Sequence, residues 1–318
     1  MAGVQLLHEA LRLIPEYRDY VWGGARLKPG ASPIAEAWVV YEKDLIESGP
    51  YAARTLGEAA AEQGAALLGG RTYQHTGLRF PLLIKLLDCA AWLSLQVHPN
   101  DQQAQALEGA GQFGKTEAWY FLDTATGAEM LCGLSPGTTP EQLAQAIRTG
   151  KLLNLTRRIP VTKGDSIFIS PGTIHALGPG LLVYEVQQTS DITYRVYDWD
   201  RPATPQRPLH IEKSIAVANP AAVAECQPQP PLTDGSQHTL IACDYFTLEL
   251  LATKTKPLHL DTHAESFHAL TVLDGQALIA GEGWQQTLNR FETSLVPAAC
   301  GSYTIHPRGD LTLLKASA

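Results

Sequence analysis

The sequence has few cysteines and no long apolar run, and these absences exclude several classes of protein. Its five cysteines are an odd number and include no C-x-x-C pair. We therefore expect no disulfide framework, and a reducing cytoplasm is the expected compartment. No stretch approaches the roughly 18 apolar residues of a transmembrane helix, so no membrane partner is expected. Residues 1–14 are interrupted by His8, Glu9 and Arg12 and lack the pattern of a signal peptide.

Runs of lysine or arginine are absent as well. The formal net charge is −8 at pH 7. Proteins that bind nucleic acid usually carry a basic face, so nucleic acid is not an expected partner. An anionic ligand would have to be held by a few local cations against the overall negative field.

Turn residues and short apolar runs are what the sequence does contain. The 27 glycines and 21 prolines are spread along 318 residues, which is typical of a β-rich protein with many turns. Strand-like runs occupy residues 37–41, 81–87, 91–97, 118–122, 166–169, 181–187 and 193–197. A second series follows at residues 239–241, 246–252, 267–272, 276–280, 293–296 and 311–314. The Pro-rich segment 227–235 separates the two series, so we expect a first domain over 1–226 and a smaller β domain over 236–318.

Three segments have helical spacing and fall within the first expected domain, at about 56–68 and within 100–157. Leu56–Leu68 is rich in alanine. Asp101–Glu108 can be started by Asn100 as an N-cap, and Thr139–Arg148 opens with a cap, a proline and an acid. A short helix is also expected over residues 151–157.

The strongest local signal is the segment LSLQVH, residues 93–98, in which apolar side chains alternate with Ser94, Gln96 and His98. Side chains alternate between the two faces of a strand, so these three polar groups share one face. Within a longer apolar run, such a face predicts a lined cavity. The alternative is a surface strand whose polar face meets water.

A second segment, KTEAWY, places Lys115, Glu117 and Trp119 on one face of a strand. A buried carboxylate is costly unless it is paired or binds a metal, so Glu117 has either an ion-pair partner or an ion. A third segment, residues 164–175, contains a strand, a Pro-Gly turn and then His175. That turn can direct the imidazole into the mouth of a barrel, although a histidine after a turn is more often a surface residue.

Taken together, these segments offer a metal site of His98, Glu117 and His175, with Gln96 as a further oxygen donor. Two histidines and one glutamate suit Zn²⁺ and leave a coordination position open for substrate. The same set can hold Fe²⁺, Mn²⁺ or Co²⁺, so the residue types alone leave the metal open.

The third segment resembles the second motif of the cupin superfamily, with Gly164, Gly172 and His175 in register and the proline displaced by one position. The chain from about residue 20 to 214 is similar to the type I phosphomannose isomerases in their short bacterial form. The segments that carry the resemblance are VWGG (21–24), EAW (36–38), PLLIKLLD (81–88), LSLQVHPND (93–101), GKTEAWY (114–120), GDSIFISPGTIHALGPG (164–180), EVQQTSDITYRVYDWDR (185–201) and RPLHIEK (207–213).

The resemblance implies a mainly β, cupin-type jelly-roll barrel with a helical insertion and a second, smaller cupin-like domain. It implies zinc as the metal on His98, Glu117 and His175, with Gln96 an additional ligand in some members. It assigns the active-site arginine to Arg195. The implied reaction interconverts mannose 6-phosphate and fructose 6-phosphate.

The resemblance also implies that Lys115 is the family's lysine beside the metal glutamate and that Ser94 is its phosphate-contacting serine. The phosphate is further expected to meet one or more cations, with Lys85 and Arg201 as candidates. Trp22 can line the cavity or pack in the core, as can Trp38.

The reaction needs a base close to C1 and C2 of the sugar, and we expect Glu185 to serve, because it shares a strand face with Leu181 and Val183 and can be drawn inward. Burial in an apolar strand would also raise its pKa towards neutrality. Lys115 is the alternative base. Arg195 stays protonated and is expected to supply fixed positive charge instead.

Three other functions remain open from the sequence. They are a cupin isomerase for another hexose phosphate such as glucose 6-phosphate, a non-catalytic sugar-binding cupin, and an oxygen-dependent metal enzyme. The last would be expected to have more histidines at its site. His259, His263 and His268 in the second series form no second site that can be argued. A monomer and a homodimer are both compatible with the sequence.

Overall fold

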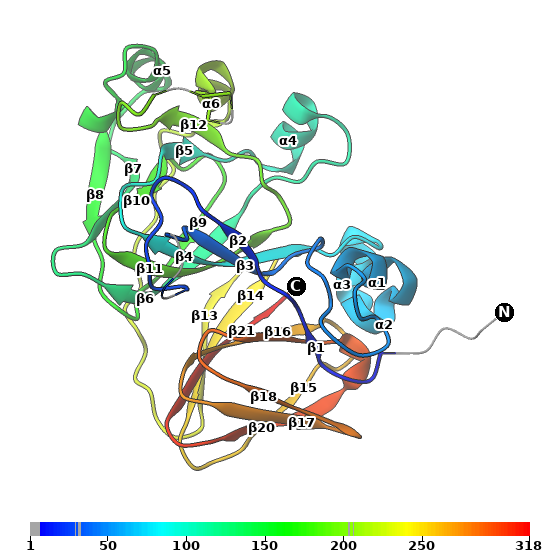
Figure 1. Cartoon of the computed structure of the whole chain (residues 1–318). Helices are drawn as coiled ribbons and strands as arrows, with labels where there is room; N and C mark the ends of the chain where they lie inside the picture. The colour runs from blue at the N-terminus through cyan, green and yellow to red at the C-terminus, as the bar shows by residue number, and fades with distance from the viewer. Residues whose placement is uncertain (1–6, 29, 31–32, 203, 206) are drawn as a thin grey trace. The chain divides into compact units, whose positions relative to one another are not determined.

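The computed structural model describes residues 7–28, 30, 33–202, 204–205 and 207–318 (Figure 1). The first six residues of the N-terminal segment discussed above lie outside these ranges. Contacts divide the chain into two units. Unit 1 contains the described residues of 1–16, 38–84 and 230–318, and unit 2 contains residues 17–37 and 85–229.

The units interleave along the chain, whereas the expected domains, 1–226 and 236–318, are consecutive. One reason is visible in the strand pairing of unit 1. The N-terminal strand β1 (Leu11–Arg12) pairs with β19 (Thr293–Val296), with Leu11 opposite Leu295. The N-terminal residues therefore complete a sheet of the C-terminal series.

Unit 2 is built on two antiparallel sheets. The first has the order β12 (Tyr194–Tyr197), β5 (Leu95–Val97), β10 (His175–Leu177), β7 (Glu129–Leu134) and β8 (Thr156–Pro160). The second has the order β2 (Glu16–Arg18), β3 (Glu36–Val40), β4 (Leu82–Cys89), β11 (Leu181–Gln188), β6 (Glu117–Thr124) and β9 (Ser166–Ile169). Strands β2, β3 and β4 each contain residues that are assigned to unit 1 as well as residues of unit 2.

Each sheet of unit 2 contributes one apolar face to a common core. Trp119, Phe121 and Val183 from the second sheet pack in one cluster with Met130 and Leu177 from the first. The opposite face of the first sheet is covered by α5 (Pro140–Arg148) and α6 (Ile211–Val217), which pack in a separate cluster (Figure 1). Burying such side chains contributes roughly 1.5–3 kcal/mol each, which holds the strands that carry the site.

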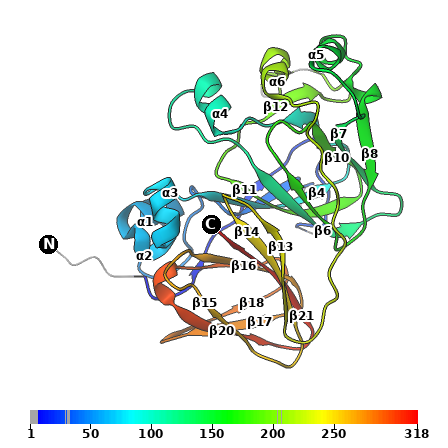
Figure 2. The same ribbon diagram turned by 180° about the vertical axis from the view of Figure 1, so that it is seen from behind.

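Unit 1 also has two antiparallel sheets around an apolar core. One has the order β1, β19, β16 (His268–Asp274), β21 (Leu311–Ser317), β14 (Thr247–Thr253) and β13 (Ser236–Ala242). The other has the order β15 (Leu258–Asp261), β20 (Ser302–Pro307), β17 (Ala277–Gly281) and β18 (Trp284–Leu288) (Figure 2). The helices of this unit are α1 (Leu56–Gln63), α2 (Ala65–Leu68) and α3 (Gly70–Thr76).

The expected helices form with the predicted caps where the sequence carries a start signal. Asn100 caps α4 (Asp101–Glu108) and Thr139 caps α5, each within a capping box. The predicted helix over Leu56–Leu68 is instead broken at Gly64, whose φ of 54° lies outside the helical region. The expected helix over 151–157 is corrected to a 3₁₀ turn (Leu152–Asn154) followed by β8.

Eight strands formed by the described residues were not expected from the sequence. They are β1, β2, β7, β8, β10, β15, β18 and β20. Of the helices formed by the described residues, none has both the length and the apolar character required to cross a membrane.

Candidate metal centre and active-site pocket

A row of side chains crosses three neighbouring strands of the first sheet of unit 2. In the antiparallel register, Gln96 on β5 lies opposite His175 on β10 and also opposite Arg195 on β12. Side chains at directly opposite positions point to the same face of a sheet. The register therefore brings together three residues that are far apart in the sequence.

His98, Glu117 and His175 form a compact group. One potential ligand atom from each residue lies within 4.8 Å of the other two, and all three side chains are buried. His175 Nε2 is 3.2 Å from Glu117 Oε1, and His98 Nε2 is 3.7 Å from Glu117 Oε2. Among the residues that the structure describes, this is the one group of histidine, cysteine and acidic side chains with such spacing.

Backbone carbonyl groups orient both imidazoles. His98 Nδ1 lies 2.8 Å from the carbonyl oxygen of Ile192, and His175 Nδ1 lies 2.9 Å from that of Thr173. A carbonyl oxygen can only accept, so each Nδ1 carries the proton and donates it. The Nε2 atoms are then left unprotonated, as metal-binding imidazoles require.

Glu117 is fully buried, and neither of its carboxylate oxygens has a hydrogen-bond partner among the described residues. Burial opposes its ionisation, but the ammonium group of Lys115, 2.6 Å from Oε2, and both histidines hold the pKa of Glu117 well below its usual range. Burial, and then the charge of Lys115, lower the pKa of His98 well below its usual value. The group thus offers a carboxylate and two imidazole Nε2 atoms, a donor set that fits a divalent ion.

A chain of buried charges continues from this group. Lys115 Nζ is 3.7 Å from Glu185 Oε1, and the same oxygen is 3.1 Å from Lys85 Nζ. Lys85 also approaches Glu36 at 3.9 Å. Burial opposes the charge of Lys85, but the carboxylates of Glu185 and Glu36 raise its pKa above the ordinary value. The indole of Trp119 donates to Glu185 Oε2 at 2.9 Å, which fixes the direction of the carboxylate.

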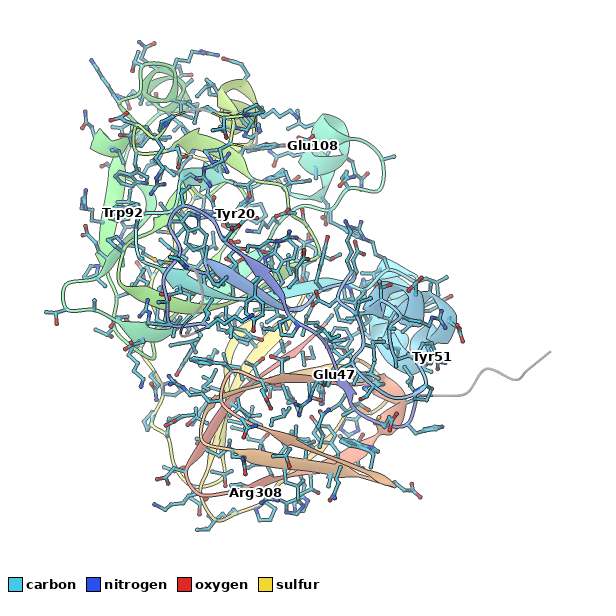
Figure 3. All side chains as sticks on the ribbon, viewed as in Figure 1. Tyr20, Glu47, Tyr51, Trp92, Glu108 and Arg308 are labelled. Carbon is cyan, nitrogen blue, oxygen red and sulfur yellow. The ribbon has the colours of Figure 1, made fainter. Side chains whose placement is uncertain are left out.

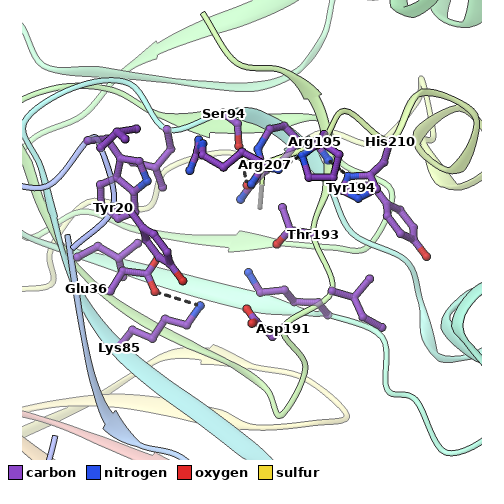
Figure 4. Close-up of a pocket in the computed structure, with 18 of the residues that line it drawn as sticks. Tyr20, Glu36, Lys85, Ser94, Asp191, Thr193, Tyr194, Arg195, Arg207 and His210 are labelled. Carbon is purple, nitrogen blue, oxygen red and sulfur yellow. Dashed lines mark hydrogen bonds and ion pairs between the residues drawn. The ribbon is translucent and has the colours of Figure 1, made fainter. Parts of the chain in front are cut away.

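Glu36, Lys85, Lys115 and Glu185 border a pocket of about 610 Å³ in unit 2. Ser94, Gln96, Lys115, Glu185 and Arg195 line it, so the structure brings together the predicted substrate-binding and catalytic candidates. In the close-up, Arg195, Arg207 and His210 lie along one wall, and Lys85 and Glu36 lie across the cavity from them (Figure 4). Tyr20 and Glu108, which are labelled in Figure 3, line the same pocket.

Arg195 is held by the segment that follows β12. Its Nη1 donates to the carbonyl oxygen of Pro208 at 3.0 Å, and its backbone N–H donates to His210 Nδ1 at 3.2 Å. Its Nε is buried and has no hydrogen-bond partner within the described ranges. Burial, followed by repulsion from the guanidinium of Arg207, lowers the pKa of Arg195.

Two other sequence expectations concerned tryptophans and cations. Trp22 lines the pocket and also belongs to the core of unit 2, whereas Trp38 packs with Tyr41 and Leu83 and is not a lining residue. Lys85 lines the pocket, but Arg201 does not, because its guanidinium binds Asp198 and the carbonyl oxygen of Trp92.

The pocket residues that the sequence reasoning missed include Glu36, Asp191 and Arg207. All three lie within segments that carry the family resemblance, but no local spacing connects them to the metal group. In unit 1, His259 and His263 border a separate hollow, and His268 contacts the hydroxyl of Tyr303.

Comparisons with known proteins identify the family of this chain. A family model described as phosphomannose isomerase type I, catalytic domain, matches residues 10–130. Mannose-6-phosphate isomerase ManA of Bacillus subtilis (strain 168) is 38% identical over 253 residues, which cover 76% of this chain and 78% of that protein.

Solved structures share the whole fold. The crystal structure of the mannose 6-phosphate isomerase from Bacillus subtilis matches with a TM-score of 0.83 at 31% identity, covering 96% of this chain and 99% of that chain. A mannose 6-phosphate isomerase bound with zinc and yttrium shares the fold with a TM-score of 0.74 at 18% identity, covering 96% and 98% of the two chains. The mainly β, cupin-type fold expected from the sequence is thereby confirmed. The chain belongs to the type I phosphomannose isomerase family.

Proposed function

We propose that the pocket of unit 2 catalyses the interconversion of mannose 6-phosphate and fructose 6-phosphate. The observation that carries the proposal is the convergence of His98, Glu117 and His175 next to Gln96 and Lys115. These two residues line a pocket together with Arg195 and Glu185. Relatives of this family are named for the same reaction, and the likeness to them extends over most of the chain.

His98, Glu117 and His175 are proposed to hold one divalent ion, with Gln96 as an additional oxygen donor. Zinc is the ion we favour, because two imidazoles and a carboxylate suit it and a solved structure with the same fold binds zinc. When bound, such an ion supplies Lewis acidity that polarises a carbonyl group. The fully buried carboxylate of Glu117, which lies 3.2 Å from His175 Nε2 and 3.7 Å from His98 Nε2, supports a cation at this position.

Glu185 is proposed as the base that moves the proton between C2 and C1. Its Oε1 lies 3.1 Å from Lys85 Nζ and 3.7 Å from Lys115 Nζ, so two cations adjoin the carboxylate. In the direction from the aldose, Glu185 takes the proton from C2 to leave a C1–C2 enediolate. The hydroxyl proton then passes from O2 to O1, and Glu185 returns its proton to C1 to give the ketose. Trp119 orients the carboxylate for both steps. Lys115 is the second candidate for this role.

Arg195 is proposed to stabilise the negative charge that develops on the sugar oxygens during proton transfer. Its guanidinium is fixed by Pro208 and lies on the wall that Gln96 shares. A preorganised cation of this kind stabilises a transition state without reorganisation. Ser94, which also lines the pocket, is proposed to contact the substrate. Unit 2 would then be the catalytic unit of a cytoplasmic enzyme.

The test is an isomerase assay on mannose 6-phosphate before chelation, after chelation and after zinc is added back. We expect activity to disappear on chelation and to return with zinc. Glucose 6-phosphate serves as the control substrate, and we expect it to react much more slowly. Activity that survives complete removal of metal would reject the metal assignment, and faster turnover of glucose 6-phosphate would reject the substrate.

A further inference from the structure

The row of side chains from His175 through Gln96 to Arg195 is continued by Arg207 on the same wall. Neighbouring strands lie about 4.8 Å apart, so two strand spacings separate the backbones of His175 and Arg195 by about 10 Å. Arg207 follows β12 along the chain and lines the same pocket. Figure 4 shows Arg207 beside Arg195, on the wall opposite Lys85.

The guanidinium of Arg207 is held on one side only. Its Nε donates to Asp198 Oδ2 at 3.0 Å and its Nη2 donates to Asp198 Oδ1 at 2.9 Å. Its Nη1 has no hydrogen-bond partner among the described residues, and its side chain is 17% exposed. The group is therefore fixed in direction while one edge of its planar fork remains able to donate.

The wall around Arg207 has more positive than negative charge. Asp198 is shared by Arg207 and Arg201. Arg195 has no carboxylate within ion-pair distance in the part of the chain that the structure describes, and its Nε is unpartnered. Like charges on a partly buried wall repel, and an anion bound between them removes the repulsion.

We propose that Arg207 is a specificity residue that binds the phosphoryl group of the substrate, with Arg195 beside it. The inference rests on the proposed function, which supplies the phosphorylated sugar. A guanidinium can donate to two phosphate oxygens at once, which favours a phosphate over a neutral hydroxymethyl group. The sugar then lies along the row, and its C1–C2 end reaches the proposed metal ligands.

Arg201 provides a matched control. It forms the other ion pair with Asp198, through Nη1 at 3.0 Å, and donates to the carbonyl oxygen of Trp92, but it does not line the pocket. Removing either guanidinium takes an ion-pair partner from Asp198, although Arg207 donates two hydrogen bonds to it and Arg201 donates one. Only the removal of Arg207 takes a cation away from the pocket.

The experiment compares the zinc-loaded wild type with Arg207→Met, Arg207→Lys and Arg201→Met. A lost charged hydrogen bond corresponds to a roughly 10- to 100-fold loss of affinity. We expect Arg207→Met to raise KM for mannose 6-phosphate by such a factor, more than kcat falls. The inhibition constant of inorganic phosphate should rise equally. Arg207→Lys should recover part of both losses, and Arg201→Met should change neither.

Equal losses in Arg207→Met and Arg201→Met would overturn the proposal, because the effect would then pass through Asp198. Unchanged KM and unchanged phosphate inhibition in Arg207→Met would overturn it as well. If the wild type does not isomerise mannose 6-phosphate, the proposed function fails, but titration calorimetry with inorganic phosphate still decides the subsite. Weaker phosphate binding in Arg207→Met than in Arg201→Met supports it, and equal binding rejects it.

Discussion

The Nδ1 atom of His98 lies 2.8 Å from the carbonyl oxygen of Ile192, which stands three residues before Arg195. This single hydrogen bond determines which nitrogen of the imidazole faces Glu117. It also connects His98, which follows β5 directly, with the segment that precedes β12. The proposed metal ligand and the proposed active-site arginine are thus positioned by connected pieces of backbone.

Replacing one of the two histidines should remove the metal and the activity together. We expect His98→Ala and His175→Ala each to reduce bound zinc to a small fraction of the wild-type content, because two protein ligands hold zinc far more weakly than three. Metal content by mass spectrometry and isomerase activity are measured on the same samples. His259→Ala, which changes an exposed histidine of unit 1, is the control. Full zinc content in either site variant would contradict the ligand assignment.

Removing the guanidinium of Arg195 should leave the metal in place. We expect Arg195→Ala to retain zinc and to lower kcat by about 10²–10³, the usual loss when a preorganised charge donor is removed. Arg195→Lys keeps the charge but loses the planar fork, and we expect an intermediate value. A wild-type kcat in Arg195→Ala would show that this residue does not stabilise the transition state.

Neutralising Glu185 should abolish proton transfer while preserving the pocket. Glu185→Gln keeps the shape and can still accept from Trp119, so we expect normal zinc content and a decrease of kcat by about 10²–10⁴. Exchange of the C2 proton of mannose 6-phosphate in deuterated water, followed by NMR, should slow by the same factor. If exchange in Glu185→Gln keeps its wild-type rate, Lys115 becomes the base to test.

Acid should destabilise unit 1 through His268. Burial, followed by the charge of Lys315, lowers the pKa of His268 to about 3. An unfolded histidine titrates near 6.5, so below that pH unfolding takes up a proton that the folded state does not bind. His268 therefore does not reduce the free energy of unfolding above about pH 6.5. As the pH falls from about 6.5 to about 3, the free energy of unfolding decreases by up to about 1.4 kcal/mol per pH unit.

Chemical denaturation across this pH range measures that slope. His268→Gln lacks the titrating group and should show a smaller decrease than the wild type, although it loses the contact with Tyr303 and starts from a lower stability. His259→Gln, at an exposed position, should follow the wild-type slope. Identical slopes in the wild type and His268→Gln would refute the prediction.

The sequence alone determined the local structure wherever a short-range signal was present. The capping residues Asn100 and Thr139 start their helices as predicted, because an N-cap acts on a backbone N–H only two or three positions away. Alternation in residues 93–98 likewise placed Ser94 and Gln96 on the pocket face. Gly64 shows the limit of such reasoning, because the break that it makes between α1 and α2 was read as continuous helix.

Only the tertiary structure decided which distant residues meet. His98, Glu117 and His175 come from separate strands, and the pairing of β5 with both β10 and β12 places Gln96 between His175 and Arg195. Antiparallel register depends on turns and core packing throughout the unit, so no local spacing in the sequence encodes it. The same reason explains why Arg207 went unnoticed and Arg201 was expected in the pocket. The shared carboxylate of Asp198 turns one guanidinium towards the pocket and the other to the backbone of Trp92.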